Sequence, residues 1–261
     1  MGVLTPMKRS AVHNLRVDAV SHPGSHDPLA VDEGLFLPRE LMRDADLAPW
    51  ERVTVARVAG GLHQNRVETF VQTSRTGRVE VAGSLAVFIE PAELVCVISE
   101  TMMTDEQLAL HSADALPVVD CGSPLGVAGS AVRWEFLSKE THIAPATART
   151  RDALPRWMMR NYIGGLVVTE THPDCLHGSA EVPGSILDRV GLTRHRMVTV
   201  YNVASGSAAR TYAVPVREGL VQTTGGMAGF APEGSTVNVA HFALSAGDSR
   251  PLVVNAVENR V

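Results

Sequence analysis

The sequence of 261 residues lacks the features by which several classes of protein are recognised. Its three cysteines, Cys96, Cys121 and Cys175, are odd in number and have no CxxC spacing, so they predict neither a disulfide framework nor a zinc site. No apolar run reaches the roughly 18 residues that a membrane-spanning helix needs, and the best candidate, Ser84 to Ser99, is broken by charged residues. We therefore do not expect the chain to enter a membrane.

Lysine is also scarce, and the basic charge comes almost entirely from arginine. The net charge of −5 is spread over interspersed signs without a basic stripe, so nucleic acid is not an expected partner. Residues 1–12 hold no apolar segment of signal-peptide length, which predicts a cytoplasmic protein. His22, His26 and Asp27 lie close together, but no further ligand follows at a fixed spacing, so no metal site is expected.

The sequence contains the same segment twice. The shared features are an apolar run, a strand motif, a Gly-bearing turn and a closing strand, at 41–55, 68–70, 82–86 and 90–98 and again at 186–200, 210–212, 224–228 and 232–240. A repeat of this length is a duplicated small domain rather than a solenoid unit. We predict a first domain over residues 1–120, a linker over 121–157 and a second domain over 158–261.

Short β-branched or apolar runs bounded by Gly, Pro and Asp predict strands at 53–58, 66–72, 94–99, 197–203, 211–216 and 236–244. Helical patterns are short and cover 38–46 and 186–190. The stretch from Thr101 to Leu110 is typical of a helix with Thr104 at its N-cap and acidic residues in its first turn. Within the linker, 132–136 could form a short strand. Many short strands with few helices favour a small closed barrel in each copy.

In the order and spacing of these motifs, both copies resemble aspartate 1-decarboxylase, a small pyruvoyl enzyme that makes β-alanine. The resemblance rests on the Leu-Met…Asp-Leu…Glu-x-Val-Thr-Val run at 41–55, on its second occurrence at 186–200, and on a Thr-Tyr pair at 211–212. It implies a mainly β fold of two tandem double-psi β-barrels that form an internal pseudo-dimer. The family assembles four barrels, so a homodimer of this chain would supply the same number.

The family's chemistry needs a Gly-Ser bond that cleaves itself and leaves a pyruvoyl group, whose ketone forms a Schiff base with the substrate and accepts electrons as CO₂ leaves. Eight Gly-Ser pairs occur in the chain, so position decides between them. Counted back from the apolar pair at 186–187, Gly178-Ser179 falls where the family cleaves. The same count in the first copy falls on Glu33-Gly34, which has no hydroxyl, and the pair at 24–25 would need a shifted loop. The expected cofactor is therefore a pyruvoyl group made from Ser179, which makes the chain a zymogen.

The resemblance assigns roles to further residues of the second copy. Thr211 would assist processing, and Tyr212 would return a proton to the decarboxylated carbon, whereas the first copy has Thr69-Phe70 without the phenol. The substrate-binding turn would be formed by Thr224, Gly225 and Gly226, with threonine in place of the family's asparagine. The histidines that flank the proposed scissile bond, at 172 and 177, could assist the acyl shift or could be ordinary loop residues.

The first copy keeps the complementary groups of the family site. His13 resembles the family's histidine near the N-terminus, with Lys8 and Arg9 close by, and Arg66 matches the arginine that grips the substrate carboxylate. The second copy has Ala208 in place of that arginine, and Arg210, on the same strand face by alternation, could substitute for it. These divided losses suggest a site shared between the copies, with Ser179, Thr211 and Tyr212 from the second and His13 with a Lys8 or Arg9 charge from the first.

The leading hypothesis is a lyase that decarboxylates aspartate or a related small acidic amino acid after self-cleavage at Gly178-Ser179. The changes at substrate-binding positions leave a second hypothesis, an unprocessed barrel that binds a small molecule and carries out acid–base, cyclisation or isomerisation chemistry in a specialised biosynthetic pathway. A third is a catalytically inactive regulatory paralogue. The expected partners are a small amino-acid-like substrate and a second copy of the chain.

Overall fold

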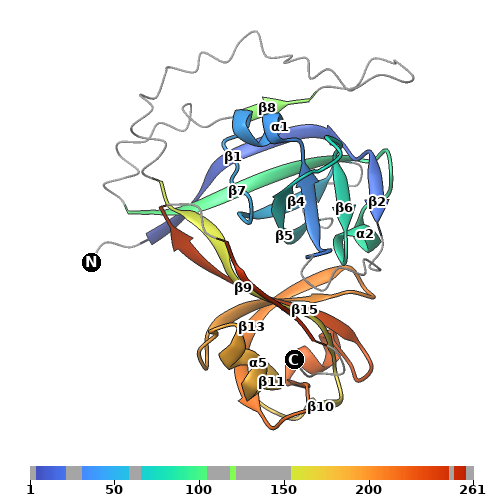
Figure 1. Ribbon diagram of the computed structural model, residues 1–261, viewed down its shortest axis with the longest axis vertical. Coiled ribbons are helices and arrows are strands. Elements are labelled where there is room, and N and C mark those ends of the chain that lie inside the picture. Colours follow the sequence, from blue (N-terminus) through green and yellow to red (C-terminus); the bar gives the residue numbers. More distant parts are fainter. Residues whose placement is uncertain are drawn as a thin grey trace.

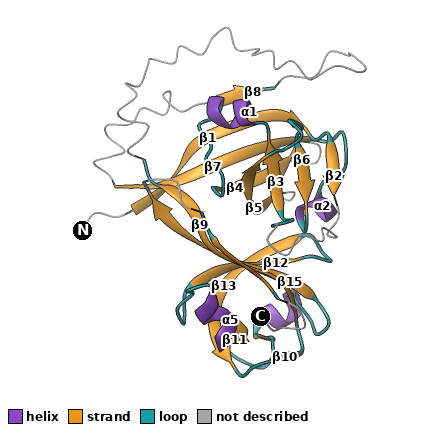
Figure 2. Ribbon diagram, in the orientation of Figure 1, coloured by secondary structure: helices purple, strands orange, loops and turns teal. Residues whose placement is uncertain are grey.

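The described residues form two β-barrels, one from each copy (Figure 1). The computed structural model describes residues 4–21, 31–58, 66–104, 118–121, 154–246 and 250–256. Figure 2 shows that strands dominate both barrels and that the helices are short. The fold is therefore mainly β, with two tandem double-psi barrels, as the sequence predicts.

The first barrel is an eight-stranded sheet in the order β2-β6-β3-β5-β4-β7-β1-β8. Its elements are β1 (Leu4–Arg16), β2 (Ala19–Ser21), β3 (Gly34–Leu37), α1 (Arg39–Asp44), β4 (Arg52–Arg57), β5 (Arg66–Thr73), β6 (Glu80–Ala82), α2 (Leu85–Phe88), β7 (Leu94–Thr104) and β8 (Val118–Asp120). Parallel pairs, such as β3 with β5, alternate with antiparallel pairs, such as β4 with β5.

The second barrel repeats this arrangement strand for strand, in the order β10-β14-β11-β13-β12-β15-β9-β16. Its elements are β9 (Arg156–Val167), β10 (Glu170–His172), β11 (Ser179–Pro183), α5 (Gly184–Arg189), β12 (Met197–Asn202), β13 (Ser207–Val216), β14 (Gln222–Thr224), α6 (Gly226–Phe230), β15 (Thr236–Ser245) and β16 (Leu252–Asn255). Because the registers of the two sheets match, each paired strand residue of one barrel has a counterpart in the other.

The six predicted strands are confirmed as β4, β5, β7, β12, β13 and β15, although β7 continues beyond its predicted end and β13 begins before its predicted start. The predicted helix from Thr101 is wrong at its start, because residues 101–104 continue β7 and pair with the beginning of β1. Strand pairing satisfies the backbone groups that a helix cap at Thr104 would otherwise have to satisfy. The remainder of that helix, the loop at 22–27 and the strand at 132–136 lie outside the described residues.

Each barrel has its own apolar core. The first is built mainly from valine and leucine of the β strands together with Leu41 and Met42 of α1. The second has the same composition and takes Ile186 and Leu187 from α5. β-Branched residues at alternate strand positions face these interiors, which is the pattern expected of a sheet closed on itself.

A third cluster joins the two barrels and is centred on Phe70 of β5. Its ring lies 6.2 to 6.4 Å, between centroids, from Tyr162, Tyr201 and Phe242 of the second barrel, and it stacks on Trp50 of the first. Phe70 and Tyr201 are completely buried. Aromatic contacts of this size hold the two copies in one fixed arrangement.

Charged side chains continue the same interface beside the aromatic cluster. Arg156 of the second barrel donates to the Asp46 carboxylate at 2.8 Å and to the Glu51 carboxylate at 3.0 Å. Arg9 of the first barrel pairs with the same two carboxylates and is itself buried. Because one buried and one half-buried guanidinium group face two carboxylates, the charges of this cluster balance.

Candidate functional site

Ser179 is the first residue of β11, and it lies beside Tyr212 of the parallel strand β13. Its side chain is buried, whereas Tyr212 is 49% exposed. Since side chains alternate along a strand, Thr211 points inward and Tyr212 outward. The pairing of β11 with β13 thus brings together Ser179, the expected source of the pyruvoyl group, and Tyr212, the expected proton donor.

The carbonyl group of Gly178, which belongs to the bond expected to break, is held by Thr211. The Thr211 hydroxyl donates a hydrogen bond of 2.7 Å to this carbonyl oxygen. Such a donor polarises the carbonyl and stabilises negative charge that develops on its oxygen.

The Ser179 hydroxyl belongs to a network organised by Thr224 of β14. Thr224 Oγ1 donates to the carbonyl oxygen of His177 at 2.7 Å and accepts the Ser179 backbone N–H at 2.9 Å. Its only proton is therefore committed, so the Ser179 hydroxyl, 2.8 Å away, donates its proton to Thr224. This leaves the lone pairs of Ser179 Oγ available for attack. Glu181 Oε1 lies 3.4 Å from the same hydroxyl.

Gly225 brings the turn that is expected to bind substrate directly against the loop that carries the Gly178-Ser179 bond. Its φ is +54°, and a Cβ on it would lie 2.8 Å from the carbonyl oxygen of Cys175 and 3.0 Å from the Gly178 nitrogen. Its own N–H donates to the carbonyl oxygen of His172 at 2.9 Å. A side chain at this position would push the Gly178-Ser179 bond away from Thr224. Gly226, by contrast, has open space around it.

A pocket of about 570 Å³ opens over Ser179 and Tyr212. The other lining residues are Leu176, His177, Gly178, His195 and Val214, all from the second copy. His195 is a pocket residue that the sequence reasoning missed. It occupies a turn with positive φ, as does its counterpart Trp50 in the first copy, and only the repeat alignment could have drawn attention to it.

The first copy cannot form the same centre. The strand register places Gly34 where the second copy has Ser179, and Phe70 where it has Tyr212. Gly34 has a φ of +104°, and a Cβ on it would lie only 2.6 Å from the backbone oxygen of Phe70. Thr224 is replaced by Ala82. The first copy therefore lacks the serine nucleophile, the threonine that would bind its hydroxyl, and the space for a side chain at position 34.

Glu33, the counterpart of Gly178, is a completely buried carboxylate. It accepts hydrogen bonds from the backbone and side chain of Ser84, at 3.0 and 2.6 Å, and from Asn238 of the second barrel at 2.9 Å. Burial raises its pKa, and these hydrogen bonds oppose the shift. The residue at the position equivalent to Gly178 thus forms a buried contact between the barrels.

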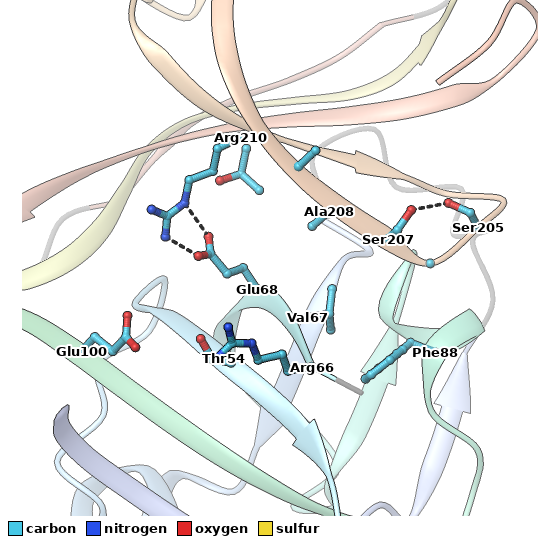
Figure 3. Close-up of a pocket in the computed structure, with 13 residues that line it drawn as sticks. Thr54, Arg66, Val67, Glu68, Phe88, Glu100, Ser205, Ser207, Ala208 and Arg210 are labelled. Carbon is cyan, nitrogen blue, oxygen red and sulfur yellow. Dashed lines mark hydrogen bonds and ion pairs between the residues drawn. The ribbon is translucent and has the colours of Figure 1, made fainter. Parts of the chain in front are cut away.

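The two candidate arginines lie on opposite walls of a second pocket, of about 610 Å³, between the barrels (Figure 3). Arg210 forms a two-pronged ion pair with Glu68 of the first copy, so its guanidinium group already has a carboxylate partner. Arg66 lies below this pair in Figure 3 and is exposed. The pocket does not include Ser179.

The structure does not bring the first copy's candidate groups to Ser179 within the described part of one chain. His13 Nδ1 contacts Cys96 Sγ at 3.3 Å, at the middle of the β1–β7 pair. Arg9 is buried against Asp46 and Glu51, and desolvation lowers its pKa despite those carboxylates. Arg9 is therefore not a cation that a substrate could reach, while Lys8 is exposed.

These features define a double-barrel protein in which one copy has a Gly-Ser pair surrounded by threonine hydroxyl groups and the other copy does not. A model of the aspartate decarboxylase family matches the chain twice, at residues 25–121 and 154–259. The chain belongs to the aspartate decarboxylase family and carries two fused copies of its domain. Among the described residues, no helix is long and apolar enough to span a membrane, and no group of His, Cys, Asp and Glu is arranged to hold a metal ion.

Proposed function

We propose that the chain is a proenzyme that cleaves itself between Gly178 and Ser179 and then decarboxylates a small acidic amino acid. The observation that carries the proposal is the hydrogen bond of 2.7 Å from Thr211 to the Gly178 carbonyl oxygen, next to a serine whose hydroxyl is held by Thr224. An ordinary turn does not require a nucleophile, an oxyanion donor and a proton acceptor around one peptide bond.

Cleavage would begin with attack of Ser179 Oγ on the Gly178 carbonyl carbon. The C–N bond breaks, the nitrogen takes the hydroxyl proton through Thr224, and an ester replaces the amide. Loss of the Ser179 α-proton then breaks the Cβ–O bond, so that Gly178 leaves as a carboxylate. One water molecule displaces the nitrogen as ammonia, which converts residue 179 into a ketone. Thr211 stabilises the oxyanion of the first step.

The residues around Ser179 fit a pyruvoyl group. Thr211 has a donor hydroxyl beside this residue, Thr224 Oγ1 lies 2.8 Å from the Ser179 hydroxyl, and the pocket lined by Tyr212 admits a small molecule. When present, the group supplies an electrophilic carbonyl that binds the substrate amine and withdraws electrons as CO₂ leaves. Tyr212 lines this pocket, and its phenol would deliver a proton to the substrate carbon.

Intact-mass spectrometry of the purified protein tests the proposal. We expect two fragments, residues 1–178 and 179–261, whose summed mass exceeds that of the chain by one water minus one ammonia. Ser179→Ala should remain one chain and lose all decarboxylase activity. Ser235→Ala, at another Gly-Ser pair, is the matched control and should cleave normally. A wild-type chain that stays intact through prolonged incubation would overturn the proposal.

The pairing of Arg210 with Glu68 favours a second candidate, an unprocessed barrel that binds a small molecule. This ion pair removes the cation that was expected to replace the missing arginine at Ala208. Under this alternative, Ser179 remains a serine and Ser179→Ala keeps full ligand binding. The same variant therefore separates the two functions.

A further inference from the structure

We infer that the first copy, which has no counterpart of the Ser179 hydroxyl, carries a separate pocket that binds a zwitterionic α-amino acid with an apolar side chain. This pocket has a volume of about 650 Å³ and lies on the outer face of β3, β5 and β6. Such a volume is ordinary for a small-molecule site. The inference does not depend on the proposed function, because none of the residues that line this pocket lines the pocket over Ser179.

A single row of side chains across three strands forms the floor of the pocket. Phe36 of β3 pairs with Glu80 of β6 on one side and with Gln72 of β5 on the other. All three residues are half-buried, whereas a neighbour of each on its strand belongs to the apolar core of the barrel. Since side chains alternate across a strand, this row faces outward into the pocket.

The lining differs in charge from that of the equivalent place in the second copy. Trp50 and Gln72 line this pocket where His195 and Val214 line the pocket over Ser179. The pocket over Ser179 contains no Asp, Glu, Lys or Arg side chain, whereas the pocket in the first copy contains two carboxylates and two guanidinium groups. The two copies therefore present pockets that suit chemically different ligands.

The charged groups of the pocket are Asp32 and Glu80, and Arg75 and Arg250. None of the four forms an ion pair with another described residue, so the opposite charges in the pocket are not paired with each other. Their sum is zero. A dianion or a dication would meet a like charge, whereas a zwitterion can place its carboxylate on a guanidinium group and its ammonium group on a carboxylate.

Two of the groups that would receive the ligand are already fixed in place. Thr76, which also lines the pocket, donates its hydroxyl proton to Glu80 and so orients this carboxylate. The amide nitrogen of Gln72 donates to the carbonyl oxygens of Val31 and Glu33, at 3.0 and 2.9 Å, which anchors the floor of the pocket. Groups that are held in this way lose little conformational freedom when a ligand binds.

Trp50 forms a preorganised aromatic wall. Its backbone N–H donates to the Val71 carbonyl oxygen at 2.7 Å, and its carbonyl oxygen accepts the Met159 N–H at 2.9 Å. The indole ring stacks on Phe70 with 6.0 Å between centroids. The φ of Trp50 is +70°, and a bulky residue keeps this conformation only where its surroundings fix it. The half-buried indole therefore offers a ligand a fixed apolar surface.

Apolar groups from both barrels surround the rest of the space. Val31 and Phe36 come from the first barrel, and Pro251 and Val253 come from the start of β16 and the residue before it in the second. Together with Trp50 they favour an apolar ligand side chain, because the ammonium and carboxylate groups of the ligand engage the charges. L-Aspartate would bring a net negative charge to a pocket whose own charges already balance.

Isothermal titration calorimetry with L-leucine and L-phenylalanine tests the ligand class. Each should bind at one site per chain, in the wild type and in Ser179→Ala alike. L-Aspartate, 4-methylpentanoate, which lacks the amine, and 3-methylbutylamine, which lacks the carboxylate, should each bind at least about tenfold more weakly than L-leucine, because a charged group of the pocket loses its partner or meets a like charge. No saturable binding of either amino acid, or equal binding of 4-methylpentanoate, would overturn the inference.

Variants then locate the ligand. Arg75 and Arg250 are exposed, so the double variant Arg75→Ala/Arg250→Ala should stay folded by circular dichroism and bind L-leucine at least about tenfold more weakly. Arg217→Ala, at the position in the second copy that corresponds to Arg75, is the matched control and should bind normally. Unchanged affinity in the folded double variant, or loss of binding in Tyr212→Phe, would overturn the inference. A chain that stays uncleaved but binds L-leucine would refute the proposed function and leave this pocket standing.

Discussion

The Thr211 hydroxyl offers the sharpest test of the cleavage chemistry. The substitution Thr211→Val replaces this hydroxyl by a methyl group and keeps the shape of the side chain. Thr211 donates a hydrogen bond of 2.7 Å to the Gly178 carbonyl oxygen, which would become the oxyanion during cleavage. Removal of one such donor typically slows a reaction by about 10²–10³-fold, or about 2.7–4 kcal/mol of barrier. The same hydrogen bond contributes only about 1 kcal/mol to the folded state, so the barrier effect dominates. We therefore expect slow cleavage in a folded protein.

The first copy provides the matched control. Thr69 is the counterpart of Thr211, and its buried hydroxyl has no hydrogen-bond partner among the described residues. Thr69→Val should thus leave cleavage unchanged and be neutral or slightly stabilising. The assay follows the fraction of intact chain by mass spectrometry from the end of synthesis onward. Cleavage of Thr211→Val at the wild-type rate, or equal slowing by Thr69→Val, would refute the role given to Thr211.

Three further outcomes are expected. Tyr212→Phe should cleave normally in the mass assay but lose most turnover in a CO₂-release assay, whereas a defect in cleavage would show that the phenol acts earlier. Gly225→Ala should slow cleavage and lower the melting temperature, because its Cβ would collide with the Cys175 carbonyl oxygen; an unchanged rate would separate the turn from the scissile bond. The raised pKa of Glu33 means that its contribution to stability is greatest below the ordinary glutamate pKa and is lost as pH rises through the raised value. Glu33→Gln should remove this part of the pH dependence of the melting temperature, and identical profiles for the two proteins would contradict it.

The sequence predicts the strand core and the duplicated barrel because apolar periodicity and repeat spacing are local properties. It does not reveal the long strands β1 and β9, whose sequences mix charged, polar and apolar residues. Those strands are held by pairing with β7 and β15, which is a tertiary effect. The misassigned helix start at Thr101 has the same origin.

The candidate site divides in the same way. Ser179, Thr211 and Thr224 could be predicted from the resemblance to the family, and the repeat alignment shows that the first copy has Gly34 and Ala82 in place of Ser179 and Thr224 but keeps a threonine at 69. The burial of Arg9 and the pairing of Arg210 with Glu68 could not be predicted, since both depend on how the barrels meet. Similarly, the sequence shows that the first copy has Gly34 in place of the serine. It does not show that a side chain at this position would collide with the backbone of Phe70.

The central claim is that Ser179 becomes a ketone, and borohydride reduction of the 179–261 fragment tests it most directly. If residue 179 is a pyruvoyl group, the fragment has no amino-terminal amine and gains two hydrogens on reduction, as measured by mass spectrometry. Simple hydrolysis of the same bond would instead leave an amino-terminal serine that sequencing can read and borohydride does not change. A reducible fragment is the result expected here, and an amino-terminal serine, or no fragment, would contradict it.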